Sequence, residues 1–194
     1  AQLNLKHLII GDDFRFGAER AGDFQLLKDW GKSNGTEVIA NKTVTRDGLR
    51  ISSTRIREAL LQSKFELAAQ LLGRPYTFSG KVVYGKQLGR TIGVPTANLW
   101  IPKQRLPIAG VYAVKCSLAG ESFNGIANMG IRPTVDGSKP VLEIHIFDFS
   151  ESIYGQRLTV EFKNKLRDEK KFDNIDLLKE QILQDISHAK EILE

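Results

Sequence analysis

The chain has 194 residues, which suits one domain, or one domain plus a fragment of another. Its hydrophobic content of 41% and charged content of 26% are ordinary for a globular protein, and no apolar run is long enough to span a membrane. The net charge of +5 is not gathered in long Lys/Arg runs, so we expect no nucleic-acid partner. The single cysteine, Cys116, excludes an internal disulfide and favours a cytoplasmic setting.

The first part of the chain predicts an α/β unit. Residues 5–11 and 38–40 are short apolar runs typical of buried strands. Residues 22–34 have the spacing of an amphipathic helix, and Gly35 is a typical helix end. The loop over residues 12–17 would lie at the carboxyl edge of the sheet, where α/β proteins bind their ligands.

Hydroxyl side chains begin the next predicted helix, which continues through Leu61. Ser52, Ser53 and Thr54 come first, and Arg57 follows within one turn. Free N–H groups at a helix start favour anions, and a nearby arginine adds positive charge. The simpler alternative is an ordinary Ser/Thr N-cap that binds nothing.

A change in apolar period marks the predicted domain boundary. A helix over residues 65–72 is followed by Arg74-Pro75, so we predict domains at residues 1–73 and 74–194. After the boundary, alternating runs with short turns predict a closed six-stranded antiparallel β-barrel. The runs cover residues 77–84, 97–101, 111–118, 122–129, 141–149 and 158–162. Residues 128–134 carry Gly and Pro, which are typical of a turn.

The last predicted element is an amphipathic helix over residues 174–193. Asp173 or Asn174 precedes its first apolar residue and is a suitable N-cap. The sequence therefore predicts a mainly β domain closed by one C-terminal helix, preceded by a partial α/β domain. It does not indicate an oligomeric state.

A glycine-rich loop follows the first strand of the predicted barrel and ends in Pro95-Thr-Ala-Asn98. Three glycines and one arginine precede the tetrapeptide: Gly85, Gly89, Arg90 and Gly93. Glycines let a backbone approach a ligand, and successive N–H groups can form a nest for an anion. The Thr96 hydroxyl and the Asn98 amide oxygen are hard-oxygen ligands that suit Mg²⁺. On spacing alone, ordinary turns explain such glycines more often.

Glu143 lies in the middle of an apolar strand, on the face opposite to Leu142 and Ile144. Phosphoryl transfer needs a group that orients or deprotonates the attacking hydroxyl, and a carboxylate can do both. The simpler alternative is a solvent-facing residue on an edge strand. His145 shares the face of Glu143 and could steady it, or it could be a packed, neutral histidine.

The loop that ends in Pro95-Thr-Ala-Asn98 resembles the signature of riboflavin kinases, and the resemblance covers residues 76–194. It implies an ATP:riboflavin 5′-phosphotransferase with riboflavin/FMN and ATP/ADP as its ligands and Mg²⁺ as its cofactor. Glu143, in a Glu-x-His context, is the implied general base, and Thr96 and Asn98 are the implied Mg²⁺ ligands. The implied nucleotide contacts are Gly85, Gly89, Arg90, Gly93, Thr96, Asn98, Asp148 and Tyr154. The implied flavin contacts are Arg167, Lys170 and Phe172.

Two earlier segments resemble the second half of the FMN adenylyltransferase domain of bifunctional riboflavin kinase/FAD synthetases. They are the loop that starts at Gly11 and the run Ile51-Ser-Ser-Thr-x-x-Arg57. The resemblance implies that Ser52, Ser53, Thr54 and Arg57 are the remnant of a site for ATP phosphates. The sequence has no His-x-Gly-His-type motif, which that family needs, so we expect a domain truncated at its N-terminus. FMN adenylylation is then doubtful in this chain and expected of its intact parent.

A different class of function is a binding module without catalysis. The barrel would then hold a flavin or single-stranded nucleic acid. Oligonucleotide-binding barrels place a row of aromatic residues along a basic groove. The strands here offer Trp100, Tyr112 and scattered Phe, which is a weak match. Salt-dependent binding of oligonucleotides without flavin binding would favour this alternative.

Overall fold

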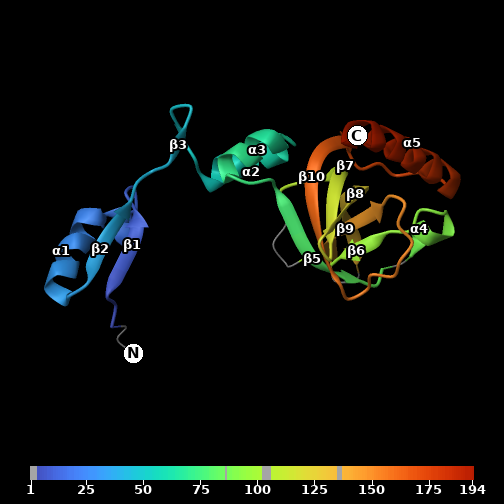
Figure 1. The fold of residues 1–194 in the computed structure, drawn as a ribbon. Coiled ribbons are helices and arrows are strands. Elements are labelled where there is room, and N and C mark those ends of the chain that lie inside the picture. The colour runs from blue at the N-terminus through green and yellow to red at the C-terminus, as the bar shows by residue number, and fades with distance from the viewer. Residues whose placement is uncertain (1–3, 86, 102–105, 135–136) are drawn as a thin grey trace. The chain divides into compact units, whose positions relative to one another are not determined.

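The computed structural model describes residues 4–85, 87–101, 106–134 and 137–194. The chain forms two compact units, Ala1–Ser52 and Ser53–Glu194 (Figure 1). Within the described ranges, no helix combines the length and the apolar character that crossing a membrane requires.

The first unit is a strand-helix-strand arrangement, as predicted. Strands β1 (His7–Gly11) and β2 (Glu37–Asn41) pair in parallel. Helix α1 (Phe24–Asn34) connects them; its N-cap Asp23 accepts a hydrogen bond from the Leu26 N–H at 3.0 Å. The rest of the unit holds the short helix η1 (Ala18–Arg20) and a hairpin of β3 (Thr45–Arg46) and β4 (Leu49–Arg50).

The first unit buries little apolar surface. Ile9 and Ile39, which face each other across the two strands, are 59% and 37% exposed. Among the described residues, no hydrophobic side chain before Ala59 is fully buried. Because burial supplies most of the folding free energy, we expect this unit to contribute little to the stability of the chain.

The second unit contains the predicted six-stranded antiparallel barrel. Its strands close in the order β10-β5-β6-β9-β8-β7. Their bounds are β5 (Thr77–Val83), β6 (Ala97–Leu99), β7 (Gly110–Leu118), β8 (Glu121–Thr134), β9 (Gly137–Ile146) and β10 (Arg157–Arg167). Alternate residues of these strands fill the interior, and Tyr112, Leu142, Ile144 and Phe162 are among the most buried. The barrel interior is therefore a packed core and not an open channel.

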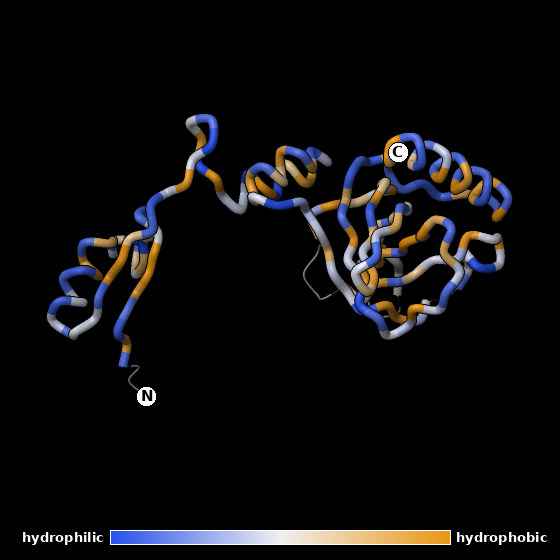
Figure 2. Tube along the Cα trace, viewed as in Figure 1, coloured by the Kyte–Doolittle hydropathy of each residue, from blue (hydrophilic) through white to orange (hydrophobic). Residues whose placement is uncertain are grey.

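Helix α5 (Ile175–Leu193) covers one outer side of this barrel (Figure 1). Asn174 is its N-cap and accepts a hydrogen bond from the Leu177 N–H at 2.9 Å. Hydrophobic residues recur along the helix (Figure 2). Ala189 and Leu193 form a second apolar cluster with Ala113 of β7 and other residues of the outer barrel wall.

Strands β8 and β9 are longer than the sequence predicts. They pair without interruption from Gly125↔Ile146 to Thr134↔Gly137, so residues 128–134 form a strand and not the expected turn. Gly130 has a packing reason to be glycine, because a Cβ at this position would overlap the carboxylate of Glu169. Glycine here signals close approach of another segment and not a change of chain direction.

Helices α2 (Ser53–Leu61) and α3 (Phe65–Leu72) pack with the barrel. Leu60, Phe65 and Ala68 belong to the same apolar cluster as the barrel interior. The Phe65 ring lies 5.6 Å from the ring of Tyr112 and 6.0 Å from that of Phe162. The division after Ser52 thus differs from the boundary predicted after residue 73, because the change in apolar period marks the end of a helix and not the end of its packing partners.

Replacing Phe65 by Ala should therefore destabilise the barrel. Removal of a buried phenyl ring costs about 3–5 kcal/mol of unfolding free energy. Urea unfolding, followed by near-UV circular dichroism, would measure this loss. Phe14→Ala, which changes a 41% exposed ring of the first unit, is the control and should leave the barrel transition in place. An unchanged barrel transition in Phe65→Ala would restore the boundary after residue 73.

Candidate active site

Three polar side chains form a row across neighbouring strands of the barrel. Glu143 of β9 is paired with Asn98 of β6 on one side and with Asn128 of β8 on the other. Their chain neighbours, such as Leu142 and Ile144, point into the core. Because side chains alternate along a strand, the three polar groups point outward from the barrel wall. The closed barrel has no edge strand, and Glu143 is half-buried, so it is not an exposed edge residue.

Both amides of this row have buried oxygen atoms without a partner. Asn98 Oδ1 and Asn128 Oδ1 accept no hydrogen bond from the described residues. An unsatisfied buried oxygen costs roughly 1–3 kcal/mol, and a bound group that fills the acceptor would remove this cost. Gly85 packs closely against the Asn98 side chain, because a Cβ on Gly85 would overlap the Asn98 amide. The row is therefore suited to receive a cation or a hydrogen-bond donor.

Asn128 is not one of the site residues predicted from the sequence, although residues 128–134 resemble a block that riboflavin kinases carry near the nucleotide. It stands at the start of the run that predicts a turn, and only the long β8–β9 pairing places it beside Glu143. The signal that could have identified Asn128 is its position opposite Glu143 on the neighbouring strand. That signal can be used only when the pairing of the β8–β9 hairpin is known.

A cavity of about 250 Å³ lies beside the row, on the outer face of the barrel. Its wall includes Glu143, Asn128 and Thr96. Helix α5 contributes Ile175, Leu178, Ile182 and Asp185 to the lining. The apolar lining residues are Ile92, Val94, Val111, Ile126, Phe172, Ile175, Leu178 and Ile182. The cavity thus combines a largely apolar surface with a few polar groups, which is typical of a site for an organic ligand.

A second cavity, of about 80 Å³, lies next to the first. Arg90, Thr96 and Tyr154 are among its lining residues. The Tyr154 ring stacks on that of Tyr84, with 4.0 Å between the ring centroids. Thr96 lines both cavities, so a ligand in one could meet a ligand in the other at this hydroxyl.

The glycine-rich segment is folded onto itself. Residues Leu88–Thr91 form a short helix, α4. The N–H groups of Arg90, Ile92, Gly93 and Val94 all donate to carbonyl groups within the segment. These four groups are therefore not open to a phosphate, in contrast to the predicted nest. Gly89 serves close packing, because a Cβ there would overlap the Val94 carbonyl oxygen, and Gly93 adopts a φ of 80°.

His145 holds the residue that precedes Thr96. Its Nδ1 donates a hydrogen bond to the Pro95 carbonyl oxygen at 2.8 Å. Burial lowers the pKa of the imidazole below its ordinary value, while the Pro95 carbonyl and the Asp148 carboxylate act in the opposite direction. The histidine is thus the packed, neutral group that was one of the two alternatives, and it fixes the start of β6.

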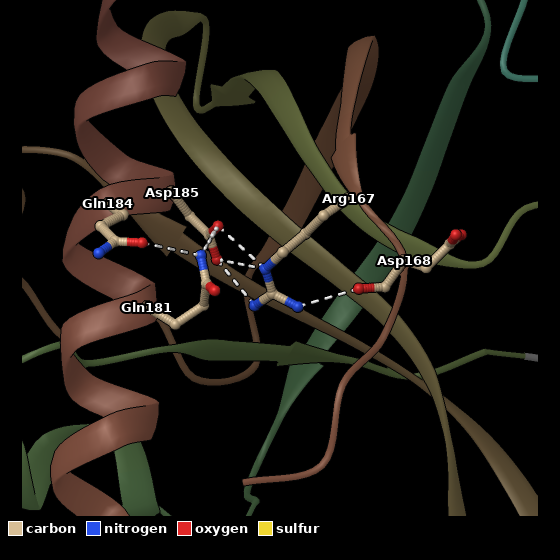
Figure 3. Close-up of polar contacts among 5 residues, drawn as sticks. All are labelled: Arg167, Asp168, Gln181, Gln184 and Asp185. Carbon is tan, nitrogen blue, oxygen red and sulfur yellow. Dashed lines mark hydrogen bonds and ion pairs between the residues drawn. The ribbon is translucent and has the colours of Figure 1, made fainter.

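Arg167, a predicted flavin contact, is engaged by protein groups. Its Nε lies 2.9 Å and 3.0 Å from the two carboxylate oxygens of Asp185, and its Nη2 lies 2.8 Å from Asp185 Oδ2 (Figure 3). Its carbon Cζ lies 5.8 Å from the centre of the Phe172 ring. Arg167, Lys170 and Phe172 all line the larger cavity, as expected for a site that holds a planar ring.

The remaining predicted residues are dispersed. Four predicted nucleotide contacts line neither cavity: Gly85, Gly93, Asn98 and Asp148. The Asp148 carboxylate lies 4.0 Å from Lys190 Nζ. The four residues predicted from the adenylyltransferase resemblance belong to different units. Ser52 ends the first unit, whereas three exposed residues lie in α2 of the second unit: Ser53, Thr54 and Arg57.

Comparisons with known proteins match the two parts of the chain to two different families. A match to the riboflavin kinase family covers residues 72–193, and a match to the FAD synthetase family covers residues 1–55. The bifunctional riboflavin kinase/FMN adenylyltransferase of Haemophilus influenzae is 52% identical over 97% of this chain and 61% of its own length. The enzyme of the same name from Pseudomonas fluorescens is 46% identical over the same shares. The chain thus spans about three fifths of the length of these curated relatives.

A solved structure also resembles this chain. A macrolide-efflux protein from Streptococcus pneumoniae is 37% identical and superimposes with a TM-score of 0.74. The similarity covers 94% of this chain and 60% of that one. It supports the fold over nearly the whole described chain.

The lowered pKa of His145 predicts a pH dependence of stability. The unfolded chain protonates this residue near its ordinary pKa of 6.5, and the folded chain does so only at lower pH. The contribution of His145 is therefore complete above pH 6.5 and declines as the pH falls below it. The advantage of the wild type over His145→Asn, which keeps an N–H donor, in unfolding free energy should therefore shrink as the pH falls below 6.5. A difference that is constant between about pH 5 and pH 8 would contradict the assignment.

Proposed function

The chain belongs to the riboflavin kinase family, and we propose that its barrel transfers the γ-phosphoryl group of ATP to the ribityl 5′-hydroxyl of riboflavin. The products are FMN and ADP. The observation that carries this proposal is the row Asn98–Glu143–Asn128, with two buried amide oxygens that lack partners, beside a mostly apolar cavity. The row offers a base and oxygen ligands at one place, which is what phosphoryl transfer requires of a protein.

Glu143 is the proposed general base. Its carboxylate takes the proton of the ribityl hydroxyl while the hydroxyl oxygen bonds to the γ-phosphorus and the bond to ADP breaks. Its location supports the role, because Glu143 is half-buried, lies on a strand that is paired on both sides and borders the larger cavity. His145, hydrogen-bonded to Pro95, is not needed as the base.

Thr96 and Asn98 are the proposed ligands of Mg²⁺. The donor set fits, since both offer neutral oxygen atoms, and the buried Asn98 Oδ1 has no other partner among the described residues. When bound, Mg²⁺ would neutralise negative charge on the transferring phosphate. The Thr96 hydroxyl lies where the two cavities meet, so it also orients the end of the nucleotide toward riboflavin.

The two cavities suggest how the substrates divide the site. The smaller one suits the nucleotide, with Arg90 near the phosphates and Tyr154 at its edge. The larger one suits the flavin ring, because its lining is largely apolar and Lys170 and Phe172 border it. Gly85 and Gly89 remain proposed nucleotide contacts; in the structure they permit close packing against the Asn98 amide and the Val94 carbonyl oxygen. Asp148 remains a proposed nucleotide contact, although it lines neither cavity.

The first unit is part of a domain to which we assign a second activity of the longer protein. The matched relatives are named as bifunctional enzymes, and residues 1–55 match the FAD synthetase family. We propose that the intact protein also adenylylates FMN to FAD. We expect this chain alone to stop at FMN, because its sequence has no His-x-Gly-His-type motif.

A cytoplasmic setting fits the single cysteine, a buried thiol whose pKa is raised to about 12 by burial.

The direct test incubates the chain with riboflavin, ATP and Mg²⁺ and separates the flavins by chromatography. The proposal expects FMN without FAD. FAD formation would show that the adenylyltransferase activity does not need the missing motif. Riboflavin that binds without becoming FMN would favour the non-catalytic flavin-binding barrel.

Replacing Glu143 by Gln should lower kcat for FMN formation by roughly 10²–10⁴-fold, which is the usual contribution of a general base. The amide preserves the shape of the side chain, so the melting temperature should change little. Glu121→Gln, on the exposed start of β8, is the matched control and should retain full activity. Near-normal turnover in Glu143→Gln would remove the base from the mechanism.

Replacing Thr96 by Ala should weaken Mg²⁺-dependent nucleotide binding, because the variant loses a proposed metal ligand. Calorimetric titration with ADP, with and without Mg²⁺, separates the two contributions. Thr96→Ser keeps the hydroxyl and should bind MgADP nearly as well as the wild type. Equal affinities in Ala and Ser variants would mean that this oxygen is not a ligand.

A further inference from the structure

Helix α5 carries a buried charge in the middle of its length. Asp185 is 5% exposed and is the only acidic or basic residue of the described side chains that is so deeply buried. Its carboxylate accepts hydrogen bonds from Arg167 and from Gln181 Nε2, which lies 3.1 Å from Oδ1 (Figure 3). Burying such a pair gains little stability, since apolar residues of similar size often serve as well or better. The pair therefore calls for a role other than holding the helix in place.

The other side of the Arg167 guanidinium contacts the segment that follows β10. Nη1 donates to the Asp168 carbonyl oxygen at 3.0 Å. The Phe172 ring lies near the guanidinium carbon, at 5.8 Å. We call residues 168–173 the cover segment, because Glu169, Lys170 and Phe172 border the larger cavity. Asp185 thus holds a side chain that contacts both ends of this segment.

Two glycines of the barrel wall provide the seat of the cover segment. A Cβ on Gly110 would come within 2.5 Å of the Arg167 carbonyl oxygen and 3.4 Å of Asp168 Cα. A Cβ on Gly130 would overlap the Glu169 carboxylate. The register of β10 also shifts between Lys165 and Arg167, and such bulges redirect side chains at the end of a strand. The segment therefore packs on the barrel in one defined arrangement.

We propose that Asp185 is a positioning residue for riboflavin, acting through Arg167. The proposal rests on the function proposed above. Asp185 fixes the guanidinium, the guanidinium fixes the cover segment, and the segment presents Phe172 to the flavin ring before the ring arrives. Arg167 then supports the flavin site from behind, because most of its donors are already committed to Asp185 and Asp168.

The expected consequence is selective for one substrate. If the cover segment were disordered, riboflavin would have to order it on binding. Each side chain that is immobilised in this step reduces the binding free energy by about 0.5–1.5 kcal/mol. Loss of the pair should therefore raise the Kd and KM of riboflavin by about tenfold. The Kd of MgADP and the kcat at saturating riboflavin should stay near the wild-type values, because neither residue touches the reacting atoms.

A double variant separates positioning from stability. Asp185→Leu and Arg167→Met each leave one buried charge alone, so each should lower the melting temperature. The double variant Arg167→Met/Asp185→Leu should regain the melting temperature, because an apolar pair can replace a buried ion pair. Its riboflavin affinity, measured by quenching of flavin fluorescence, should stay about tenfold weaker. A merely structural role predicts that both properties recover together, and that result would overturn the proposal.

Asp185→Asn covers the case in which the double variant does not fold. It preserves the shape of the side chain and one oxygen acceptor, and it should weaken riboflavin binding while MgADP binding is retained. An unchanged riboflavin affinity in Asp185→Asn would overturn the inference. A recovered riboflavin affinity in the double variant would overturn it as well. Lys190→Met is the matched control, because it removes another ion pair between α5 and the barrel, and Lys190 lines neither cavity. A wild-type chain that binds no riboflavin would overturn the proposed function, and this inference with it.

Discussion

The register of β9 against its two neighbours is the constraint on which the site depends. Glu143 faces Asn98 on β6 and Asn128 on β8, so one strand position brings together groups from three parts of the chain. A slip of one residue would turn Glu143 into the core and bring Leu142 or Ile144 to the surface. The apolar residues that fill the barrel therefore also specify where the carboxylate points, and folding and chemistry are determined by the same alternation.

Because the barrel interior is packed, the larger cavity lies on its outer wall and needs further segments to enclose it. Helix α5, the segment that includes α4 and the segment after β10 supply these walls. Each is attached by specific contacts: the His145–Pro95 hydrogen bond, the Arg167–Asp185 ion pair and the seats at Gly110 and Gly130. The strands provide the reactive groups, and the attached segments provide the enclosure.

Much of this architecture follows from local patterns. Alternating apolar residues predict the strands, the 3.6-residue period predicts α5, and Glu143 and Thr96 stand out by residue type and context. Features that depend on pairing between distant parts of the chain do not follow from local sequence patterns. Asn128 joins the site only through a hairpin, and Asp185 meets Arg167 only because β10 bulges at its end. The internal hydrogen bonds of the glycine-rich segment likewise depend on how it folds back on itself.

The packing of α2 and α3 has a consequence for dividing the chain into fragments. Residues 56–71 lie between the two family matches, which end at 55 and begin at 72. Yet Leu60, Phe65 and Ala68 occupy the interior cluster of the barrel. A fragment cut at the family limits would open one end of that cluster to water. The smallest autonomous form of the barrel should instead begin at about Ser53, and an artificial linker or fused partner is best joined before that residue.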